Sequence, residues 1–459
     1  MPFLPWLRSK SEHVQPLTLA QEVDRLAADS RVHRLFEWFS RHERDIADFQ
    51  LAITAVPAPP FAEQARAAWF AARLQPCGLA TTTDAVGNLL AARPGLQPDS
   101  PSIVLSAHLD TVFPASAPLN IRREHAQLLG PGISDNGSGL AALWALAAAF
   151  HEVGVQTAMP LLFVANVGEE GEGNLRGMRH LYRRHLPPAA EDLPAPSLAA
   201  LIALDGAGSE NIVSQALGSR RFQIVITGPG GHSWSDFGAP NPVVAAALAV
   251  ATLFRIPLPV NPRTTLNVGG IEGGISINTI PQRAVVKVDL RSSDPARLDE
   301  LEQLLRRAVA DACAETQARS PSSCAQLDYA ITMVGERPAG ELPPASPLLA
   351  AIRAVDAHLG TRAQLQRAST DANIPLSLGL EAVSLGAGGS GGGAHTLHEW
   401  FNPAGREQAL KRLALLILLL AGLPSASASA GLSPLPGQSR VPAPTATPDS
   451  VTPDSKEPA

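Results

Sequence analysis

The sequence has few cysteines for its length. Its 459 residues include three, Cys77, Cys313 and Cys324, and none of them forms a CxxC pair. Three dispersed cysteines do not make a disulfide framework, and a thiolate zinc site is not expected without closely spaced cysteines. Any metal ion bound by this chain would therefore be held by histidine, aspartate and glutamate.

The sequence also lacks a long apolar segment. Its most apolar run, Leu413–Leu423, is about half as long as a segment that spans a bilayer, so it predicts a buried helix and no membrane contact. Residues 1–20 have no continuous apolar core of the kind found in secretory signal peptides. These features favour a cytoplasmic protein.

Concentrated positive charge is missing as well. The formal net charge is -6, and the basic residues are scattered along the chain, so there is no electrostatic footprint for nucleic acid. A dinucleotide-binding oxidoreductase would need GxGxxG after its first strand, and here the first strand is followed by His108-Leu-Asp110. The segment Gly386–Gly393 contains no GxxxxGK phosphate loop. We interpret that glycine-rich segment as flexible backbone that lies beside a site and contacts substrate.

The chain has the composition of a globular protein, with 45% hydrophobic and 17% charged residues. Its length favours two domains plus tails. Helical periodicity covers residues 18–50 and Phe61–Leu74. Short apolar runs then alternate with helical stretches such as Gly139–Phe150, an order that predicts a mostly parallel sheet flanked by helices, an α/β fold. The expected strands of this region are Ile103–Ala107, Leu161–Val167, Leu198–Leu204 and, near the end, Ala382–Leu385.

A second type of pattern begins near Arg221. It predicts strand, helix, two strands, helix and strand, the order of the split-βαβ (ferredoxin-like) α+β fold. The expected elements are Phe222–Thr227, Pro242–Phe254, Thr265–Ile271, Ala284–Arg291, Ala296–Cys313 and Gln326–Val334. We therefore expect a catalytic domain at 18–218 and 337–423, an inserted domain at 219–336, an N-terminal extension at 1–17 and a disordered tail at 424–459.

Most of the metal-competent side chains follow expected strands of the larger domain, and Asp135 lies in a loop before the helical stretch Gly139–Phe150. Ligands bind at the carboxyl ends of the strands in open parallel sheets, so these side chains should meet at one edge. Each alone has an ordinary explanation, such as a turn, a helix cap or a solvated acidic loop, but their joint occurrence favours a metal site. They are His108, Asp135, Glu169, Glu170, Asp205 and His395.

These residue types suit a pair of metal ions. Two ions about 3.5–4 Å apart need a bridging carboxylate and further ligands on each ion, and zinc accepts imidazole and carboxylate. Asp110, two residues after His108, is placed to orient that imidazole. Adjacent glutamates allow one to bind metal while the other acts as a base toward water and then protonates the leaving amine.

The motifs Ser-Ala-His108-Leu-Asp110-Thr-Val, Ser-Asp135-Asn-Gly-Ser-Gly, Gly-Glu169-Glu170-Gly and Ala-His395-Thr-Leu-His-Glu399 resemble those of one clan. It contains glutamate carboxypeptidase, aminoacylase, peptidase T, acetylornithine deacetylase and succinyl-diaminopimelate desuccinylase. The resemblance implies two zinc ions, which cobalt or manganese could replace. It implies Asp135 as the bridging ligand, His108 with Asp205 on one ion, and Glu170 with His395 on the other. Glu169 would be the general base, Asp110 the partner of His108, and the Asp135–Asn136 bond is often cis in relatives.

In the inserted domain the resemblance implies three further site residues. His232, in a Gly-Gly-His-Ser sequence, matches the lid histidine that reaches a neighbouring subunit's active site in relatives, which implies a homodimer. Asn278 and Arg291 match positions that bind a substrate carboxylate or the reaction oxyanion. A surface histidine and a structural ion pair are the ordinary alternatives for His232 and Arg291. Many relatives have aspartate at the position of His398, so we expect this position to affect specificity or metal tuning.

The leading hypothesis is therefore an exopeptidase that cleaves the amide bond of small peptides. An N-acyl-amino-acid deacylase would use the same site residues, and these residues do not separate the two substrates. A non-catalytic scaffold would be expected to have lost a ligand or the base, and this chain has all five ligands and Glu169.

Overall fold

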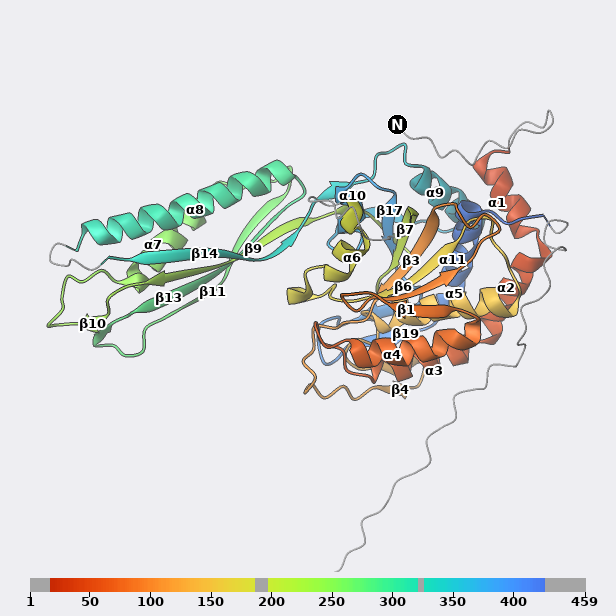
Figure 1. Cartoon of the computed structure of the whole chain (residues 1–459), viewed down its shortest axis with the longest axis horizontal. Coiled ribbons are helices and arrows are strands. Elements are labelled where there is room, and N and C mark those ends of the chain that lie inside the picture. The colour runs from red at the N-terminus through yellow and green to blue at the C-terminus, as the bar shows by residue number, and fades with distance from the viewer. Residues whose placement is uncertain (1–16, 186–196, 321–325, 426–459) are drawn as a thin grey trace, which may run out of the picture. The chain divides into compact units, whose positions relative to one another are not determined.

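The computed structural model describes residues 17–185, 197–320 and 326–425. The predicted N-terminal extension and C-terminal tail lie almost entirely outside these residues, as does Cys324. The main structure is a nine-stranded sheet with the order β1-β2-β6-β3-β7-β17-β8-β15, in which β16 also pairs with β8 (Figure 1).

Four strands form the parallel centre of this sheet. They are β6 (Leu161–Asn166), β3 (Ser102–His108), β7 (Leu198–Leu204) and β17 (Ala382–Leu385), and each runs parallel to its neighbour. Nearly all of their residues are buried, as expected for strands covered on both faces. The four predicted strands are thus confirmed to within one residue at each end, and their carboxyl ends share one edge of the sheet.

The outer strands of the sheet were not predicted. They are β1 (Ala80–Thr83), β2 (Leu89–Arg93), β8 (Asn211–Ala216), β15 (Gly340–Glu341) and β16 (Gln364–Ala368). A separate four-stranded sheet lies near the site, formed by β18 (Ser390–Gly392), β19 (Trp400–Asn402), β5 (Gln127–Leu129) and β4 (Arg122–Glu124). Most of these strands are short and partly polar, so they lack the apolar run on which sequence interpretation depends.

The N-terminal helical region differs from the expected pattern. Residues 18–50 were predicted as helix, and the structure has three helices there, α1 (Leu19–Ala27), α2 (Ser30–Arg41) and α3 (Glu43–Thr54). The first break occurs because the backbone of Asp29 is extended and its carboxylate caps α2 by accepting the N–H of Arg31 at 2.8 Å. Helix α4 (Gln64–Leu74) begins three residues after the predicted Phe61, whose φ of 71° is not helical.

The remaining helices of the larger region are α5 (Gly137–Glu152), α6 (Arg176–Leu181), α9 (Pro347–Leu359), α10 (Asn373–Ser377) and α11 (Arg406–Ala421). Single 3-10 turns occur at Gln75–Cys77, Gly171–Gly173 and Arg183–His185. Helix α5 packs on β3, β6 and β7, and α11 packs on β3, α2 and α9. Nearly all of α11 is buried, as predicted for the apolar run. Within the described residues, no helix combines the length and apolarity needed to cross a membrane.

Residues 218–337, called the inserted region below, form a second structure with its own core. Its elements are β9 (Gly218–Thr227), β10 (Gly231–His232), α7 (Pro242–Phe254), β11 (Thr264–Gly273), β12 (Thr279–Ile280), β13 (Arg283–Ser292), α8 (Pro295–Ala318) and β14 (Asp328–Arg337). Four of the strands form an antiparallel sheet in the order β11-β13-β9-β14. This confirms the split-βαβ order, whereas the division of the chain into domains at particular residues stays a prediction.

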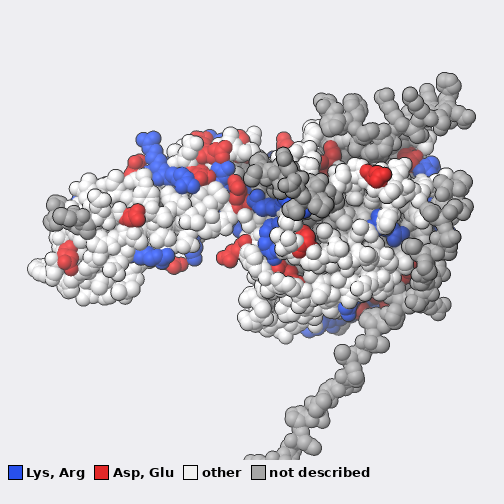
Figure 2. Space-filling model, viewed as in Figure 1, with Lys and Arg blue, Asp and Glu red and all other residues white. Residues whose placement is uncertain are grey.

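Charges of both signs are mixed on the described part of the face shown in Figure 2. On the face shown in Figure 2, Lys and Arg alternate with Asp and Glu, and the described part of that face has no broad patch of one sign. This distribution agrees with the scattered basic residues of the sequence.

Candidate metal centre

The structure brings the predicted metal ligands to one place. Their atoms form groups of three within which all ligand atoms lie within 4.8 Å of one another. One group is His108, Asp135 and Asp205, a second is Asp135, Glu170 and His395, and a third is His108, Glu169 and Glu170. The parallel strands explain this convergence, because β3 ends at His108 while Glu169 and Asp205 follow β6 and β7.

Asp135 lies between the first two groups. Its Oδ1 is 3.1 Å from His108 Nε2, and its Oδ2 is 3.2 Å from His395 Nε2. Each imidazole also faces a second carboxylate, Asp205 at 3.8 Å from His108 and Glu170 at 2.9 Å from His395. One aspartate is therefore shared by two sets, each with one histidine and one further carboxylate.

The carboxylates of the cluster favour positive charge on their neighbours. The carboxylate of Asp135 raises the pKa of His395 to about 9. Burial alone would lower the pKa of His108, but the surrounding carboxylates outweigh it and raise that pKa well above its ordinary value. Oδ1 of Asp135 is buried without a well-aligned hydrogen bond, although His108 is close. Imidazole and carboxylate donors arranged in this way fit two divalent cations, which would replace the protons.

Asp110 supports the site in a way that differs in part from the prediction. His108 Nδ1 lies 3.0 Å from the backbone carbonyl of Asp110 and 3.7 Å from its carboxylate, which is too long for a hydrogen bond. The carboxylate instead accepts the backbone N–H groups of Glu169 at 3.0 Å and Glu170 at 2.7 Å. Asp110 therefore orients His108 through its backbone and fixes the two glutamates through its side chain.

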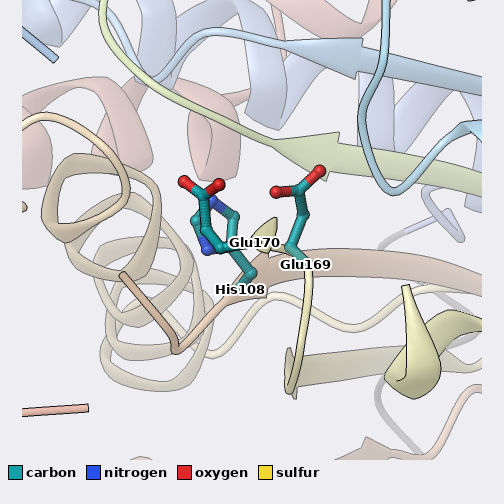
Figure 3. Close-up of side chains that lie close together, drawn as sticks. All are labelled: His108, Glu169 and Glu170. Carbon is teal, nitrogen blue, oxygen red and sulfur yellow. The ribbon is translucent and has the colours of Figure 1, made fainter. Parts of the chain in front are cut away.

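Glu169 is a buried carboxylate beside the ligands. Figure 3 shows it with His108 and Glu170, and both carboxylates point to the same side. Burial raises the pKa of Glu169 well above its ordinary value, and the guanidinium of Arg337 opposes this shift. Arg337 donates from Nη1 to Glu169 Oε1 at 2.9 Å. Glu169 is thus the carboxylate of the site that is paired with an arginine.

The loop that carries Asp135 depends on the start of α5. The peptide bond between Asp135 and Asn136 is cis, as the motif resemblance led us to expect. The side chain of Asn136 accepts the N–H of Gly139 at 3.1 Å and donates to the carbonyl of Leu204 at 2.8 Å. A Cβ atom at Gly139 would lie 2.4 Å from that same carbonyl oxygen, so glycine is required where α5 meets the end of β7.

Glu399 and Asp371 are supporting residues to which sequence interpretation gave no role. The buried carboxylate of Glu399 accepts three backbone N–H groups of the Asp135 loop, from Gly132 at 2.7 Å and from Ser134 and Asp135 at 2.8 Å each. Burial raises the pKa of Asp371 to about 7, and its Oδ2 accepts the amide of Asn166 at 2.8 Å. The position of Glu399 four residues after His395, inside a quoted motif, was the available signal.

In the segment that follows β17, the structure explains the glycines by close packing, whereas we expected flexibility. Ala387 and Gly388 donate backbone N–H groups to Gly206 and Gly208, at 2.9 and 3.0 Å. A Cβ atom at Gly386 would lie 2.3 Å from the carbonyl oxygen of Gly208. These glycines permit close packing against the segment that follows Asp205, while contact of this loop with substrate stays a prediction.

The three predicted site residues of the inserted region lie apart from this cluster in their described contacts. His232 is exposed, and its Nδ1 accepts the N–H of Trp234 at 3.2 Å. The carbonyl of Asn278 accepts the N–H of Ser233 at 3.0 Å, which joins these two segments. Arg291 pairs with Asp289 at 2.7 Å. Their roles in a reaction stay predictions.

Several known peptidases resemble this chain in sequence or in fold. The chain is 33% identical to a probable carboxypeptidase of Aspergillus terreus over 227 residues, 46% of this chain and 49% of that protein, so it spans about half the length of the curated relatives it matches. Aminopeptidase PepT of Bacillus cereus superposes with a TM-score of 0.66 at 18% identity, covering 83% of this chain and 99% of that one. Human carnosine dipeptidase 1 gives 0.64 at 14% identity, covering 85% and 100%. The model of peptidase family M20/M25/M40 matches residues 104–420, and the chain belongs to that family.

Proposed function

We propose that this protein is a two-metal hydrolase that cleaves the amide bond of a small peptide. The observation that carries the proposal is the position of Asp135, whose two oxygens face two separate sets of histidine and carboxylate. We propose zinc as the native metal, two ions per chain, with cobalt or manganese as substitutes. A Bacillus subtilis peptidase of similar fold, with a TM-score of 0.60, is described as binding a dinuclear metal centre.

The residues of the site would divide the reaction among them. His108 and Asp205 would hold one ion, Glu170 and His395 the other, and Asp135 both. The bound ions would lower the pKa of a water molecule and polarise the substrate carbonyl. Glu169 would then accept the proton of that water and deliver it to the leaving amine. Asp110 keeps Glu169 and Glu170 in place through their backbone N–H groups.

A carboxylate on the substrate is the second part of the proposal. Arg291 and Arg221 lie at the end of the inserted sheet nearest the cluster, and Arg221 donates to the carbonyl of Gly171 at 3.1 Å. Both contact the carboxylate of Asp289, a partner that a substrate carboxylate could replace by accepting two parallel hydrogen bonds from a guanidinium. Arg291 and Asn278 would bind this group or the oxyanion, as the family resemblance implies. The relatives described as probable carboxypeptidases favour a peptide substrate.

An N-acyl-amino-acid deacylase is the alternative, because the same residues would serve an acyl amide. The purified protein should be analysed for metal and assayed with free di- and tripeptides beside N-acetyl and N-succinyl amino acids. Peptide cleavage that stops on metal removal supports the proposal, and cleavage of acyl amino acids alone selects the alternative. Glu169→Gln should keep its zinc and lose turnover. Unchanged turnover would remove Glu169 from its assigned role.

We also propose a homodimer formed through the inserted region. Strand β11 is an edge of its sheet. Large apolar side chains are almost fully exposed in the segments that follow β10, at the end of α7 and beyond it, and after β11: Trp234, Phe237, Phe254, Val260, Ile275 and Ile277. Exposed apolar patches of this kind often mark protein contacts, and a partner covering them would bring His232 to the neighbouring active site. Sedimentation that finds only fully active monomer would contradict this. The cytoplasmic location stays a prediction.

A further inference from the structure

Arg337 joins the inserted region to the carboxylate of Glu169. It is the last residue of β14, and its side chain is 8% exposed. Its Nη1 donates to Glu169 Oε1 at 2.9 Å and lies 3.1 Å from the hydroxyl of Ser369, and its Nη2 donates to the backbone carbonyl of Glu169. One guanidinium therefore holds both the side chain and the backbone of Glu169.

The backbone on both sides of Arg337 is attached to the larger region. Glu336 donates its N–H to the side chain of Asn174 at 2.9 Å, and its carbonyl accepts from Arg179 at 2.5 Å. The carbonyl of Pro338 accepts the amide of Asn373 at 3.0 Å. The same Asn373 amide lies 3.0 Å from the carbonyl of Leu217, just before β9. Both strands that connect the inserted region are thus anchored where Arg337 enters the site.

We propose that Arg337 is a positioning residue that holds Glu169 in the orientation needed for proton transfer. A glutamate side chain has several rotatable bonds, and a buried carboxylate with one fixed oxygen loses most of that freedom before the reaction begins. Planar guanidinium groups are suited to this because their donors have fixed directions. This inference rests on the proposed function, since it gives Glu169 the role of general base.

The register of the inserted sheet relates Arg337 to Arg291. Arg337 pairs with Ser219 in β9, and Ser219 pairs with Arg291 in β13. Directly paired residues project to the same face of a sheet, and two strand spacings separate the outer members by about 10 Å. Arg291, proposed for the substrate carboxylate, and Arg337, proposed for the base, therefore stand in one row. The two arginines are expected to affect different kinetic constants.

The ordinary alternative is that Arg337 only fastens the inserted region. Arg179 offers a matched control, because it binds the adjacent residue Glu336 and the carbonyl of Asn174 but is not bonded to Glu169. The variants to compare are Arg337→Ala, Arg337→Lys and Arg179→Ala, each with its zinc content and its free energy of unfolding. Crystal structures of the two alanine variants would locate the carboxylate of Glu169.

Arg337→Ala should keep its zinc while its kcat falls about 100-fold with little change in KM, the scale of general-base catalysis. Millimolar guanidinium chloride should restore part of the kcat to Arg337→Ala, and not to Arg179→Ala or Glu169→Gln. Arg337→Lys should recover little, because one ammonium cannot reach both oxygens. In the crystal, the Glu169 carboxylate should move in Arg337→Ala and stay in Arg179→Ala.

Two results would overturn the inference. One is a normal kcat in Arg337→Ala, and the other is a loss equal to that of Arg179→Ala without rescue by guanidinium. Glu169→Gln separates this failure from that of the proposed function. If Glu169→Gln is inactive while Arg337→Ala is normal, the positioning role alone is wrong. If Glu169→Gln turns over normally, the base itself has been assigned wrongly.

Discussion

The substitution Asp135→Asn is expected to remove both metal ions, whereas Asp205→Asn removes one. Asp135 places one oxygen toward His108 and the other toward His395, so an amide at this position removes the negative charge that both sets share and leaves only one acceptor oxygen. Asp205 faces His108 and belongs to one set. We therefore expect Asp135→Asn to weaken metal binding at both sites.

The size of the effect follows from binding linkage. A metal present at 100 times its dissociation constant stabilises the folded state by about 2.7 kcal/mol per site. Two sites would then contribute about 5 kcal/mol to the wild-type protein. We expect about 3 kcal/mol in Asp205→Asn and close to zero in Asp135→Asn.

Urea unfolding with zinc and with EDTA measures this stabilisation as a difference within each variant. Zinc content after dialysis gives the number of ions independently. Asp311→Asn is the control, because Asp311 is an exposed acid on α8 that pairs with Arg307, and it should behave as the wild type. Two ions retained by Asp135→Asn, or a zinc effect equal to that of Asp205→Asn, would refute the shared-ligand reasoning.

Three further predictions concern the surroundings of the cluster. Glu399→Gln turns an amide toward three backbone donors, so urea unfolding should show a loss of about 2–3 kcal/mol and zinc titration a weaker affinity; wild-type values for both would contradict this. In metal-free protein the pKa of His395 is raised to about 9 from about 6.5 when unfolded, so its stabilising effect is complete below the lower value and is lost as pH rises through the higher. Zinc must displace that proton, so calorimetric titration should find affinity rising with pH over this range, and a flat profile would be inconsistent. Burial raises the pKa of Asp371 from 3.8 to about 7. In EDTA, the free energy of unfolding of the wild type should therefore fall as the pH rises from the lower to the higher value, and that of Asp371→Asn should fall less. Urea unfolding that gives the same pH dependence for both proteins would exclude this.

The centre of the fold was predictable because its strands are apolar runs that end abruptly in polar residues. Residues Leu161–Val167 and Leu198–Leu204 carry this signal, and β6 and β7 lie there. The side chains that follow them converge because parallel strands place their carboxyl ends on one edge. Strand direction was therefore sufficient to group His108, Glu170 and Asp205, whereas Asp135 and His395 come from segments next to the separate four-stranded sheet.

Contacts between distant segments were not predictable in the same way. Arg337 meets Glu169 across 168 residues, and Asn166 meets Asp371 across 205. No local periodicity marks such pairs, because each partner is an ordinary polar residue at the end of its own element. Asp110 shows a related difficulty, since its position beside His108 suggested one hydrogen bond and the fold supplies others.

The bonds that Glu399 makes to Gly132, Ser134 and Asp135 link segments 264 to 267 residues apart. During synthesis, the aspartate loop leaves the ribosome long before the glutamate that braces it, and the inserted region is made in between. Zinc capture in the complete geometry would thus be among the last events of folding. Metal uptake could serve as a natural signal that the final strands and helix α11 have docked.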